Sequence, residues 1–466
     1  MKNDIFIGAG LPSIIMALYH VNKFPDREII IIENSDTIGG SNTSIKYSNG
    51  EIFDQGMRIY YESGIDELDF FISSLLPSND FHFLEDNYKD IAGCIFNGQV
   101  QDYSPNIDLR NLDTINKEKI LGEILNSNLQ IRKKSKYKNV KDYLVDKYGE
   151  TVFSEGFSPI LNKIYNVDCS SLSIDALRNI FGAEDRIILF SEEVTSDLMK
   201  SESLRSRFGY PNQINLPKDY SKRIGRGIYP KNIGIINFTN MLKKELLKRN
   251  IKIYFNSTVD NLNIQNGAIK SLDIKNLDNN SINNLSVSSL RWGSNLVSLS
   301  KVLGLEIKNE FDMGCETYLF NIVTNKKPLI EKVYYLMDYN LSHSIFRITN
   351  YSAYCPSSFS DGFFRLTIEV WPNGKIINPR SIITELVESK IIYDDSCIVF
   401  SDLKKLSHGF PLPTLNNNLI LDQIRKGIKG LEISNLIPFC QYSKKDAFFL
   451  PQILENAYNL FQNYES

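Results

Sequence analysis

The residues with the clearest chemical potential are two glycines near the start of the chain. Gly8 and Gly10 follow a short apolar segment, residues 4–7, and precede residues 14–21, whose apolar positions share one helical face. A glycine at the first position permits a tight turn, and one at the second lets the backbone approach a pyrophosphate on the helix N-terminus. This arrangement favours binding of a dinucleotide.

The rest of this fingerprint can be located as well. Ser13 occupies its third position, where a small side chain is needed for packing of the helix on the strand. Glu33 ends a second apolar segment, residues 28–32, and its carboxylate is placed to accept hydrogen bonds from both ribose hydroxyls of an adenosine. The pattern predicts a β-α-β unit of about thirty residues. An ordinary glycine turn in an α/β sheet is the alternative.

A second glycine element follows the acid directly. It comprises Gly39, Gly40 and Ser41, and the hairpin after it ends in residues 54–58, Asp-Gln-Gly-Met-Arg. Here the chain resembles the FAD-binding superfamily of amine oxidases, protoporphyrinogen oxidases, phytoene desaturases and UDP-galactopyranose mutases. Those proteins follow the ribose-binding glutamate with a Gly-Gly turn, then with a hairpin whose Asp-x-Gly segment lies beside the flavin. A nicotinamide dehydrogenase does not need the second element, so the resemblance favours FAD over NAD.

The resemblance continues along the chain. A Tyr-Pro-Lys segment at 229–231, followed by a glycine, opens a predicted helix at 235–249, and a predicted strand at 251–255 leads back to the cofactor domain. Asn266-Gly267 predicts a hairpin. Residues 137–165 read as helical and are similar to the superfamily's helical insert. The antiparallel sheet of the substrate domain is matched by predicted strands at 317–324, 333–337, 344–349 and 363–370.

The C-terminal part carries the main departures from the superfamily. A predicted strand at 435–438 is followed by Phe439-Cys440-Gln441-Tyr442, where the superfamily usually has Gly-Asp or Gly-Arg. A strand at 285–290 precedes Arg291-Trp292-Gly293, where a proline crossover is usual. Loss of the glycine and the charge would change how the ribityl chain and the isoalloxazine ring are held.

The resemblance implies a set of cofactor-binding residues. Val259 is expected to meet the adenine through its backbone, and the last helix, opening at Leu450, is expected to point its N-terminus at the flavin or diphosphate. The full predicted set is Gly8, Gly10, Ser13, Glu33, Gly39, Gly40, Ser41, Gly56, Met57, Val259, Gln441, Tyr442, Phe449 and Leu450.

Two arginines are the candidate catalytic residues. In mutases a histidine follows the glycine of the hairpin, whereas this chain has Met57-Arg58, so mutase catalysis does not transfer directly. Arg58 beside a flavin would instead stabilise a reduced, anionic flavin by charge pairing. Arg347, in the predicted strand 344–349, would bind a diphosphate or carboxylate through its bidentate fork, with a surface ion pair as the alternative.

The predicted fold class is α/β with a discontinuous Rossmann-type FAD-binding domain. That domain is predicted to comprise residues 1–65, 212–300 and 410–466. A mainly helical insert is predicted at 66–211, and an antiparallel-sheet substrate domain at 301–409. A length of 466 residues agrees with two to three domains.

Composition excludes several classes of protein. The chain is 42% hydrophobic and 23% charged, which excludes a disordered protein, and its net charge of −3 does not favour a nucleic-acid partner. The six cysteines occur singly and the four histidines lack ligand spacing, so neither a disulfide scaffold nor a metal site is expected. No apolar run reaches the roughly 18–20 residues of a membrane span, and a cytoplasmic protein is expected. Homodimers are common in the superfamily.

Three functional interpretations remain at this stage. The first is an FAD-dependent oxidoreductase or flavin-dependent isomerase, similar to UDP-galactopyranose mutase, acting on a nucleotide- or carrier-linked sugar in surface-polysaccharide synthesis. The second is a redox enzyme of the amine-oxidase or desaturase type acting on an amine or apolar substrate. The third is a degenerate, non-catalytic member that binds nucleotide weakly or not at all, for which Ser13, Cys440 and Gln441 are the supporting features.

Overall fold

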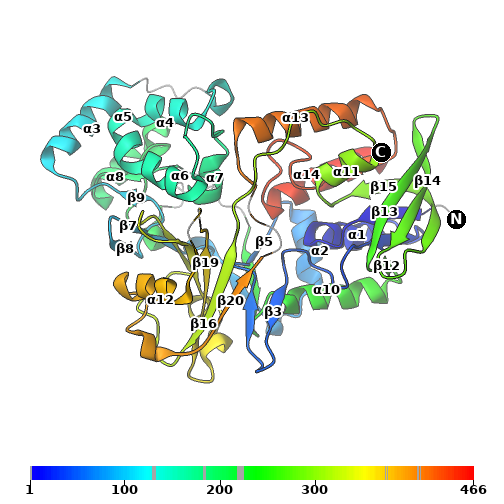
Figure 1. Ribbon diagram of the computed structural model, residues 1–466, viewed down its shortest axis with the longest axis horizontal. Helices are drawn as coiled ribbons and strands as arrows, with labels where there is room; N and C mark the ends of the chain where they lie inside the picture. Colours follow the sequence, from blue (N-terminus) through cyan, green and yellow to red (C-terminus); the bar gives the residue numbers. More distant parts are fainter. Residues whose placement is uncertain are drawn as a thin grey trace. The chain divides into compact units, whose positions relative to one another are not determined.

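The computed structural model describes residues 3–127, 133–181, 185–217, 225–372, 374, 376–406, 409 and 411–465. The chain passes four times between two units. Unit 1 comprises Met1–Phe83, Ile224–Glu310 and Leu419–Ser466, and unit 2 comprises Leu84–Arg223 and Phe311–Asn418. In the colours of Figure 1, unit 1 contains the blue, green and red segments, and unit 2 the cyan and the yellow-to-orange ones.

The centre of unit 1 is a sheet of parallel strands in the order β12-β2-β1-β15-β21. Every residue of β1 and of the all-isoleucine β2 is buried, as expected for parallel strands covered on both faces. The strands are β1 (Asn3–Ile7), β2 (Ile29–Ile32), β12 (Lys252–Tyr254), β15 (Ile282–Trp292) and β21 (Leu436–Pro438). The predicted β-α-β unit is therefore present.

An antiparallel hairpin extends this sheet. Strands β13 (Ser257–Gln265) and β14 (Ala268–Asn276) turn at Asn266 and Gly267, both with positive φ, and β14 pairs with the first half of β15. This turn is the one that the Asn-Gly pair predicted. β15 is longer than its predicted core of 285–290 and runs straight through the position of the expected crossover.

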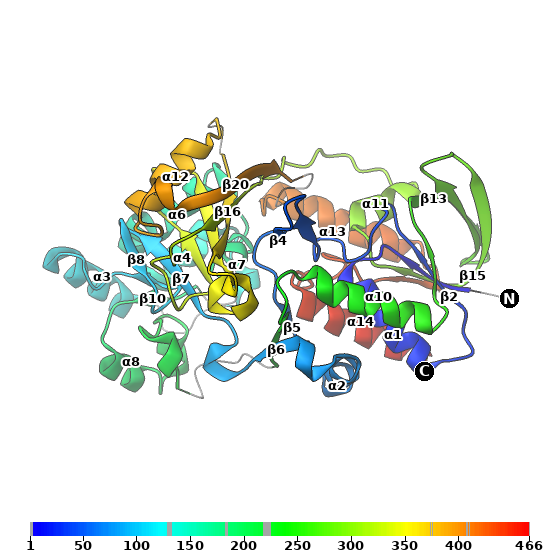
Figure 2. The ribbon, with the colours of Figure 1, turned by 90° about the horizontal axis from the view of Figure 1, so that it is seen from below.

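Helices pack against this sheet. Helix α1 (Leu11–Lys23) contacts both α10 (Ile236–Lys248) and α14 (Leu450–Glu465), and Figure 2 shows the three side by side. The remaining elements are α2 (Asp66–Leu75), α11 (Leu296–Val302) and α13 (Leu415–Gly430), the hairpin β3 (Ser44–Lys46) and β4 (Ile52–Asp54), and the small sheet β5 (Tyr60–Tyr61), β11 (Gly227–Pro230) and β6 (Phe81–Leu84).

Unit 2 contains a second sheet, in the order β20-β16-β19-β18-β17-β7-β8. Neighbouring strands are antiparallel except β7 and β17, which run parallel. The strands are β7 (Ala92–Phe96), β8 (Gln99–Gln101), β16 (Tyr318–Thr324), β17 (Tyr335–Asp338), β18 (Ile345–Asn350), β19 (Phe364–Val370) and β20 (Ile398–Lys405). Residues 84–211 of the predicted insert, which include β7, therefore lie in one unit with residues 311–409 of the predicted substrate domain. Residues 66–83 of the predicted insert lie in unit 1.

The helices of unit 2 pack around an apolar core. In this core Tyr148 stacks on Phe157, with ring centroids 5.6 Å apart. The elements are β9 (Ile107–Asp108), α3 (Thr114–Asn126), α4 (Val140–Tyr148), α5 (Glu150–Val152), a π-helical turn (Phe153–Phe157), α6 (Ser158–Tyr165), α7 (Ala176–Phe181), β10 (Ile187–Ile188), α8 (Glu192–Leu198), α9 (Glu202–Arg205) and α12 (Pro379–Glu388). Within the described part of the chain, no helix is both long and apolar enough to cross a membrane.

Candidate functional site

The carboxyl ends of the parallel strands of unit 1 bring the predicted nucleotide-binding residues to one edge of the sheet. Gly8 follows β1 and Glu33 follows β2. Gly293 follows β15 and Phe439 follows β21, and both strands run parallel to β1. In open parallel sheets this edge is where ligands bind. The candidate site is therefore built on this edge.

The first glycine turn is shaped for close approach of a ligand. Gly8 has φ +86°, and a Cβ atom there would lie 3.3 Å from the backbone nitrogen of Ser294. At Gly10 a Cβ atom would meet only Pro12, at 3.8 Å, so the space beside its Cα contains little protein. Gly10 is the N-cap of α1, and this helix has neither a side-chain cap nor an acidic residue in its first turn. An uncapped helix N-terminus of this kind suits an anionic group.

The second glycine turn lies directly against the first. The amide of Gly39 donates to the carbonyl of Ala9 at 2.8 Å, and Gly10 and Gly39 form a parallel β-bridge. A Cβ atom on Gly40 would lie 3.4 Å from the Cα of Gly10. Gly39 and Gly40 have φ of +109° and +59°, a region that favours glycine. The two elements that the sequence singled out separately therefore form one backbone cradle.

Glu33 lies at this cradle and is nearly buried, with 8% of its surface exposed. Its Oε2 accepts a hydrogen bond of 2.6 Å from the amide of Ala9, and its Oε1 accepts two from the amide and hydroxyl of Ser35. A carboxylate has about four acceptor positions, so these three bonds leave room for a further donor such as a ribose hydroxyl.

Ser13 is accommodated by a glycine that sequence reasoning did not connect with it. The Ser13 hydroxyl is buried and has no hydrogen-bond partner. A Cβ atom on Gly293 would overlap deeply with the Ser13 Oγ. The close packing that a third fingerprint glycine normally allows is therefore provided from the strand side. The one sequence signal for this packing was the position of Gly293 directly after an uninterrupted strand.

A buried carboxylate that was not among the predicted site residues lies next to the hairpin. Asp54 is fully buried and accepts hydrogen bonds from the Ser44 hydroxyl at 2.6 Å, the Tyr229 hydroxyl at 2.7 Å and the Ile235 amide at 2.8 Å. Burial raises the pKa of Asp54 to about 6, although these three donors and the charge of Arg58 act to lower it. An acid ending an apolar strand was the available sequence signal.

The segment after Asp54 returns to the second glycine turn. Gly56 has φ +85° and its amide bonds to the Asp54 carbonyl at 2.9 Å. The Arg58 Nε donates to the carbonyl of Ser41 at 2.9 Å, and its Nη1 donates to the carbonyl of Met57 at 3.1 Å. Arg58 therefore links the predicted flavin-side segment to the glycine cradle and brings a positive charge to this part of unit 1.

The remaining predicted cofactor residues occupy the hairpin and the C-terminal loop. Val259 is buried in β13, at a bulge opposite Ile274. Gln441 is exposed, while Tyr442 has φ +63° and its carbonyl accepts a bond of 2.8 Å from Arg425. Phe449 is 41% exposed immediately before α14, which opens at Leu450 as predicted.

Two details of this loop bear on the departures from the superfamily. The side chain of Gln452 accepts hydrogen bonds from the amides of Phe448 and Phe449, so a residue of α14 caps the start of its own helix. Burial raises the pKa of Cys440 to about 12, so this thiol stays protonated at neutral pH. The charge that the superfamily usually carries at this point is thus not replaced by a thiolate.

Arg347 lies in unit 2, and its fork faces a carboxylate of the same sheet. Its Nε and Nη2 donate to the two carboxylate oxygens of Glu369 at 2.6 and 2.9 Å, across the β18–β19 pair. Glu369 is buried. The bidentate geometry predicted for a diphosphate or carboxylate ligand is therefore used by an internal ion pair.

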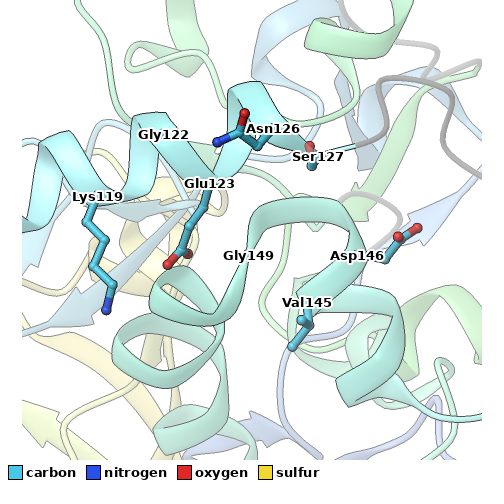
Figure 3. Close-up of a pocket in the computed structure, with 8 residues that line it drawn as sticks. All are labelled: Lys119, Gly122, Glu123, Asn126, Ser127, Val145, Asp146 and Gly149. Atoms are coloured by element: carbon cyan, nitrogen blue, oxygen red, sulfur yellow. The ribbon is translucent and has the colours of Figure 1, made fainter.

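A separate surface cavity of about 610 Å³ lies in unit 2 and contains none of the predicted site residues. Figure 3 shows its lining on α3, α4 and the segments that follow them, namely Lys119, Gly122, Glu123, Asn126, Ser127, Val145, Asp146 and Gly149. The carboxylate of Glu123 is occupied by the amide and hydroxyl of Thr151, at 2.8 Å each. Among the described residues, no group of three or more His, Cys, Asp or Glu is placed to hold a metal ion.

Comparison with known proteins identifies the fold. No family model and no curated protein matches the sequence. Among solved structures, a reduced UDP-galactopyranose mutase has a TM-score of 0.72 and 14% identity, covering 100% of this chain and 94% of the other. A protein of Exiguobacterium sp. 255-15 assigned as a protoporphyrinogen oxidase has a TM-score of 0.68 and 14% identity, with 100% and 99% covered. Putrescine oxidase with bound putrescine has a TM-score of 0.58 and 11% identity, and both chains are covered completely. These likenesses show that the chain has the fold that the sequence resemblance implied.

Proposed function

We propose that unit 1 binds FAD and that the chain is a flavin-dependent enzyme. The single observation that carries the proposal is the hydrogen bond between the two glycine turns, from the Gly39 amide to the Ala9 carbonyl. The amide of the same Ala9 donates to the Glu33 carboxylate. Two separate chain segments thereby bring glycine backbone side by side at the carboxyl edge of a parallel sheet. A dinucleotide with a diphosphate centre fits such a cradle.

The residues present fit this cofactor. Glu33 would hold the adenosine ribose, and the turn from Gly8 to Gly10 would receive the diphosphate at the uncapped start of α1. Gly39–Ser41 would line the ribityl side, and Gly56–Arg58 the flavin ring. When bound, FAD supplies hydride-transfer or nucleophilic chemistry at its N5 atom.

Arg58 is the residue of this site with the clearest electrostatic role. Its hydrogen bonds to the Ser41 and Met57 carbonyls hold the guanidinium in place. A fixed positive charge favours the anionic form of a reduced ring system over the neutral oxidised form. Arg347 remains a weaker candidate for substrate contact because its fork is already paired with Glu369.

We propose a nucleotide- or carrier-linked sugar as the substrate class, on the basis of the full-length likeness to UDP-galactopyranose mutase. The likeness to putrescine oxidase supports a second candidate, oxidation of an amine. Anaerobic addition of an amine separates the two, because only an oxidase would bleach the flavin absorbance. Binding of a nucleotide sugar that tightens after chemical reduction of the flavin would support the first.

The test of FAD binding is the visible absorption spectrum of the purified protein, followed by titration of flavin-free protein with FAD. An oxidised-flavin spectrum and release of FAD on heating are expected. Glu33→Gln should weaken FAD binding about tenfold or more, because a charge-assisted bond to ribose is lost. Glu28→Gln is the matched control, since Glu28 precedes the same strand and pairs with Lys252. A colourless protein that also fails to take up added FAD would contradict the proposal and favour the non-catalytic interpretation.

A further inference from the structure

We propose that Asp54 is a positioning residue for the cofactor: its buried carboxylate fixes the hairpin segment Gly56–Arg58 and the start of α10 in the arrangement that the cofactor requires. The inference rests on the proposed function. It concerns a carboxylate outside the predicted set of site residues. The hydrogen bonds of one cluster, Asp54, Ser44 and Tyr229, carry the proposal.

The cluster joins the β3–β4 hairpin to a strand that is far away in the sequence. Asp54 ends β4, Ser44 begins β3, and Tyr229 lies in β11. Asp54 and Tyr229 are fully buried. Both hydroxyls donate to the Asp54 carboxylate, which is therefore the common acceptor of the cluster.

The same three side chains accept hydrogen bonds from three consecutive backbone amides at the start of α10. The amide of Gly234 donates to the Tyr229 hydroxyl at 3.0 Å, that of Ile235 to Asp54 Oδ1 at 2.8 Å, and that of Ile236 to the Ser44 hydroxyl at 3.1 Å. Helix α10 has no side-chain cap from its own N-cap residue, Ile235. The cluster thus caps this helix from outside, and the carboxylate lies at the positive end of the helix dipole.

The fit at this point leaves little room for displacement. Gly234 has φ +108°, and a Cβ atom there would lie 2.9 Å from Ile52 and 3.1 Å from the Ser44 hydroxyl. A Cβ atom on Gly39 would lie 3.0 Å from the methyl group of Thr239 in α10. The second glycine turn therefore rests on the helix that the cluster caps.

The other side of the cluster leads to the predicted flavin segment. The carbonyl of Asp54 accepts the amide of Gly56, and Arg58 two residues later bonds to the carbonyl of Ser41. Movement of Asp54 would consequently shift both Gly39–Ser41 and Gly56–Arg58. Burial raises the pKa of Asp54 to about 6, so the fold keeps a carboxylate here at an electrostatic cost. Retention of such a group is typical of functional positions.

The experiment compares Asp54→Asn with Asp4→Asn. Asp4 is an equally buried carboxylate of unit 1, bonded to His20 and Ser289, but it lies at the start of β1, away from the carboxyl edge. Two quantities are measured for each variant: the Kd for FAD of flavin-free protein, and amide hydrogen exchange of residues 234–236. Asp54→Asn is expected to raise the Kd about tenfold and to speed exchange at these amides about tenfold. Asp4→Asn is expected to leave both within about twofold.

Several outcomes would overturn the proposal. Faster exchange in Asp54→Asn with an unchanged Kd would mean that Asp54 only caps α10. An equal rise in Kd for both variants would mean that any lost buried carboxylate has this effect. If Asp54→Asn does not fold, Tyr229→Phe replaces it, and an unchanged Kd in that variant would count against the proposal. If wild-type protein does not bind FAD, the proposed function fails as well, and the exchange data show separately whether the cluster caps α10.

Discussion

The packing of Gly293 against Ser13 leads to a quantitative prediction. A Cβ atom on Gly293 would overlap with the Ser13 hydroxyl and would lie 2.8 Å from Cζ of Phe439. Both neighbours are buried, so neither can move into solvent. Gly293→Ala should therefore destabilise unit 1 by overpacking, although its backbone is not in the left-handed region. Overpacking of a tight core costs about 1–3 kcal/mol, and because two neighbours are blocked the expected loss of stability is about 3 kcal/mol.

Removing the Ser13 hydroxyl should rescue much of this loss. Ser13→Ala alone should be neutral or stabilising by about 1 kcal/mol, because a buried hydroxyl without a partner is removed from a helix. In the double variant only the overlap with Phe439 remains. The coupling energy between the two sites is then expected to be about 2 kcal/mol, roughly a 30-fold change in the unfolding equilibrium constant.

The assay can report on unit 1 alone because the chain has only two tryptophans. Trp292 lies in unit 1 and Trp371 in unit 2, and both are buried. In a Trp371→Phe background, tryptophan fluorescence during urea unfolding follows the surroundings of Trp292. Gly430→Ala serves as control, since a Cβ atom at that glycine of unit 1 meets nothing within 4 Å. The explanation is refuted if Gly293→Ala costs the same free energy with Ser13 and with alanine at position 13.

Two further predictions concern each unit separately. Gly39→Ala should lower the free energy of unfolding by on the order of 3 kcal/mol and abolish FAD binding, because φ is +109° and a Cβ atom would lie 2.8 Å from the Asn42 carbonyl. Gly50→Ala is the control for backbone strain alone. Gly50 has φ +91° but open space around it, so this variant should keep FAD binding. In unit 2, burial alone would raise the pKa of Asp185, but Lys147 and Lys134 lower it to about 2 from its ordinary 3.8. That stabilisation, about 2 kcal/mol, is present above pH ~4 and lost as the pH falls towards 2. Urea unfolding at several pH values should show a free energy of unfolding that falls with the pH in this range, and Asp185→Asn should make the fall smaller by about this amount; an unchanged slope would contradict the assignment.

Local sequence patterns predicted most of the elements of the fold. The apolar run of β2, the Asn-Gly turn between β13 and β14, and the amphipathic helix α10 all lie where their residues indicated. Each depends on periodicity or backbone preference over a few neighbouring positions, which is visible without tertiary contacts. Helices α2 and α3 lie within the predicted mainly helical insert, but the sequence placed a helical segment only at 137–165 and did not locate these two helices individually.

Part of the candidate site was also predictable from the sequence. Gly8, Gly10 and Glu33 were singled out by type and spacing within a β-α-β unit, whereas Gly39 and Gly40 were indicated by the family resemblance. The sequence did not pair Arg347 with Glu369, because register between β18 and β19 decides which residues face each other.

The sequence by itself thus determined the glycine fingerprint, the chain positions of many strands and helices, and the class of fold. Tertiary structure alone decided that Gly293 makes room for Ser13 and that Asp54 caps a helix beginning 181 residues away. The physical reason is that glycine turns and periodic segments are governed by steric preferences of adjacent residues. Burial of a carboxylate and packing of a side chain against a distant backbone arise only when separate segments of the chain are brought together.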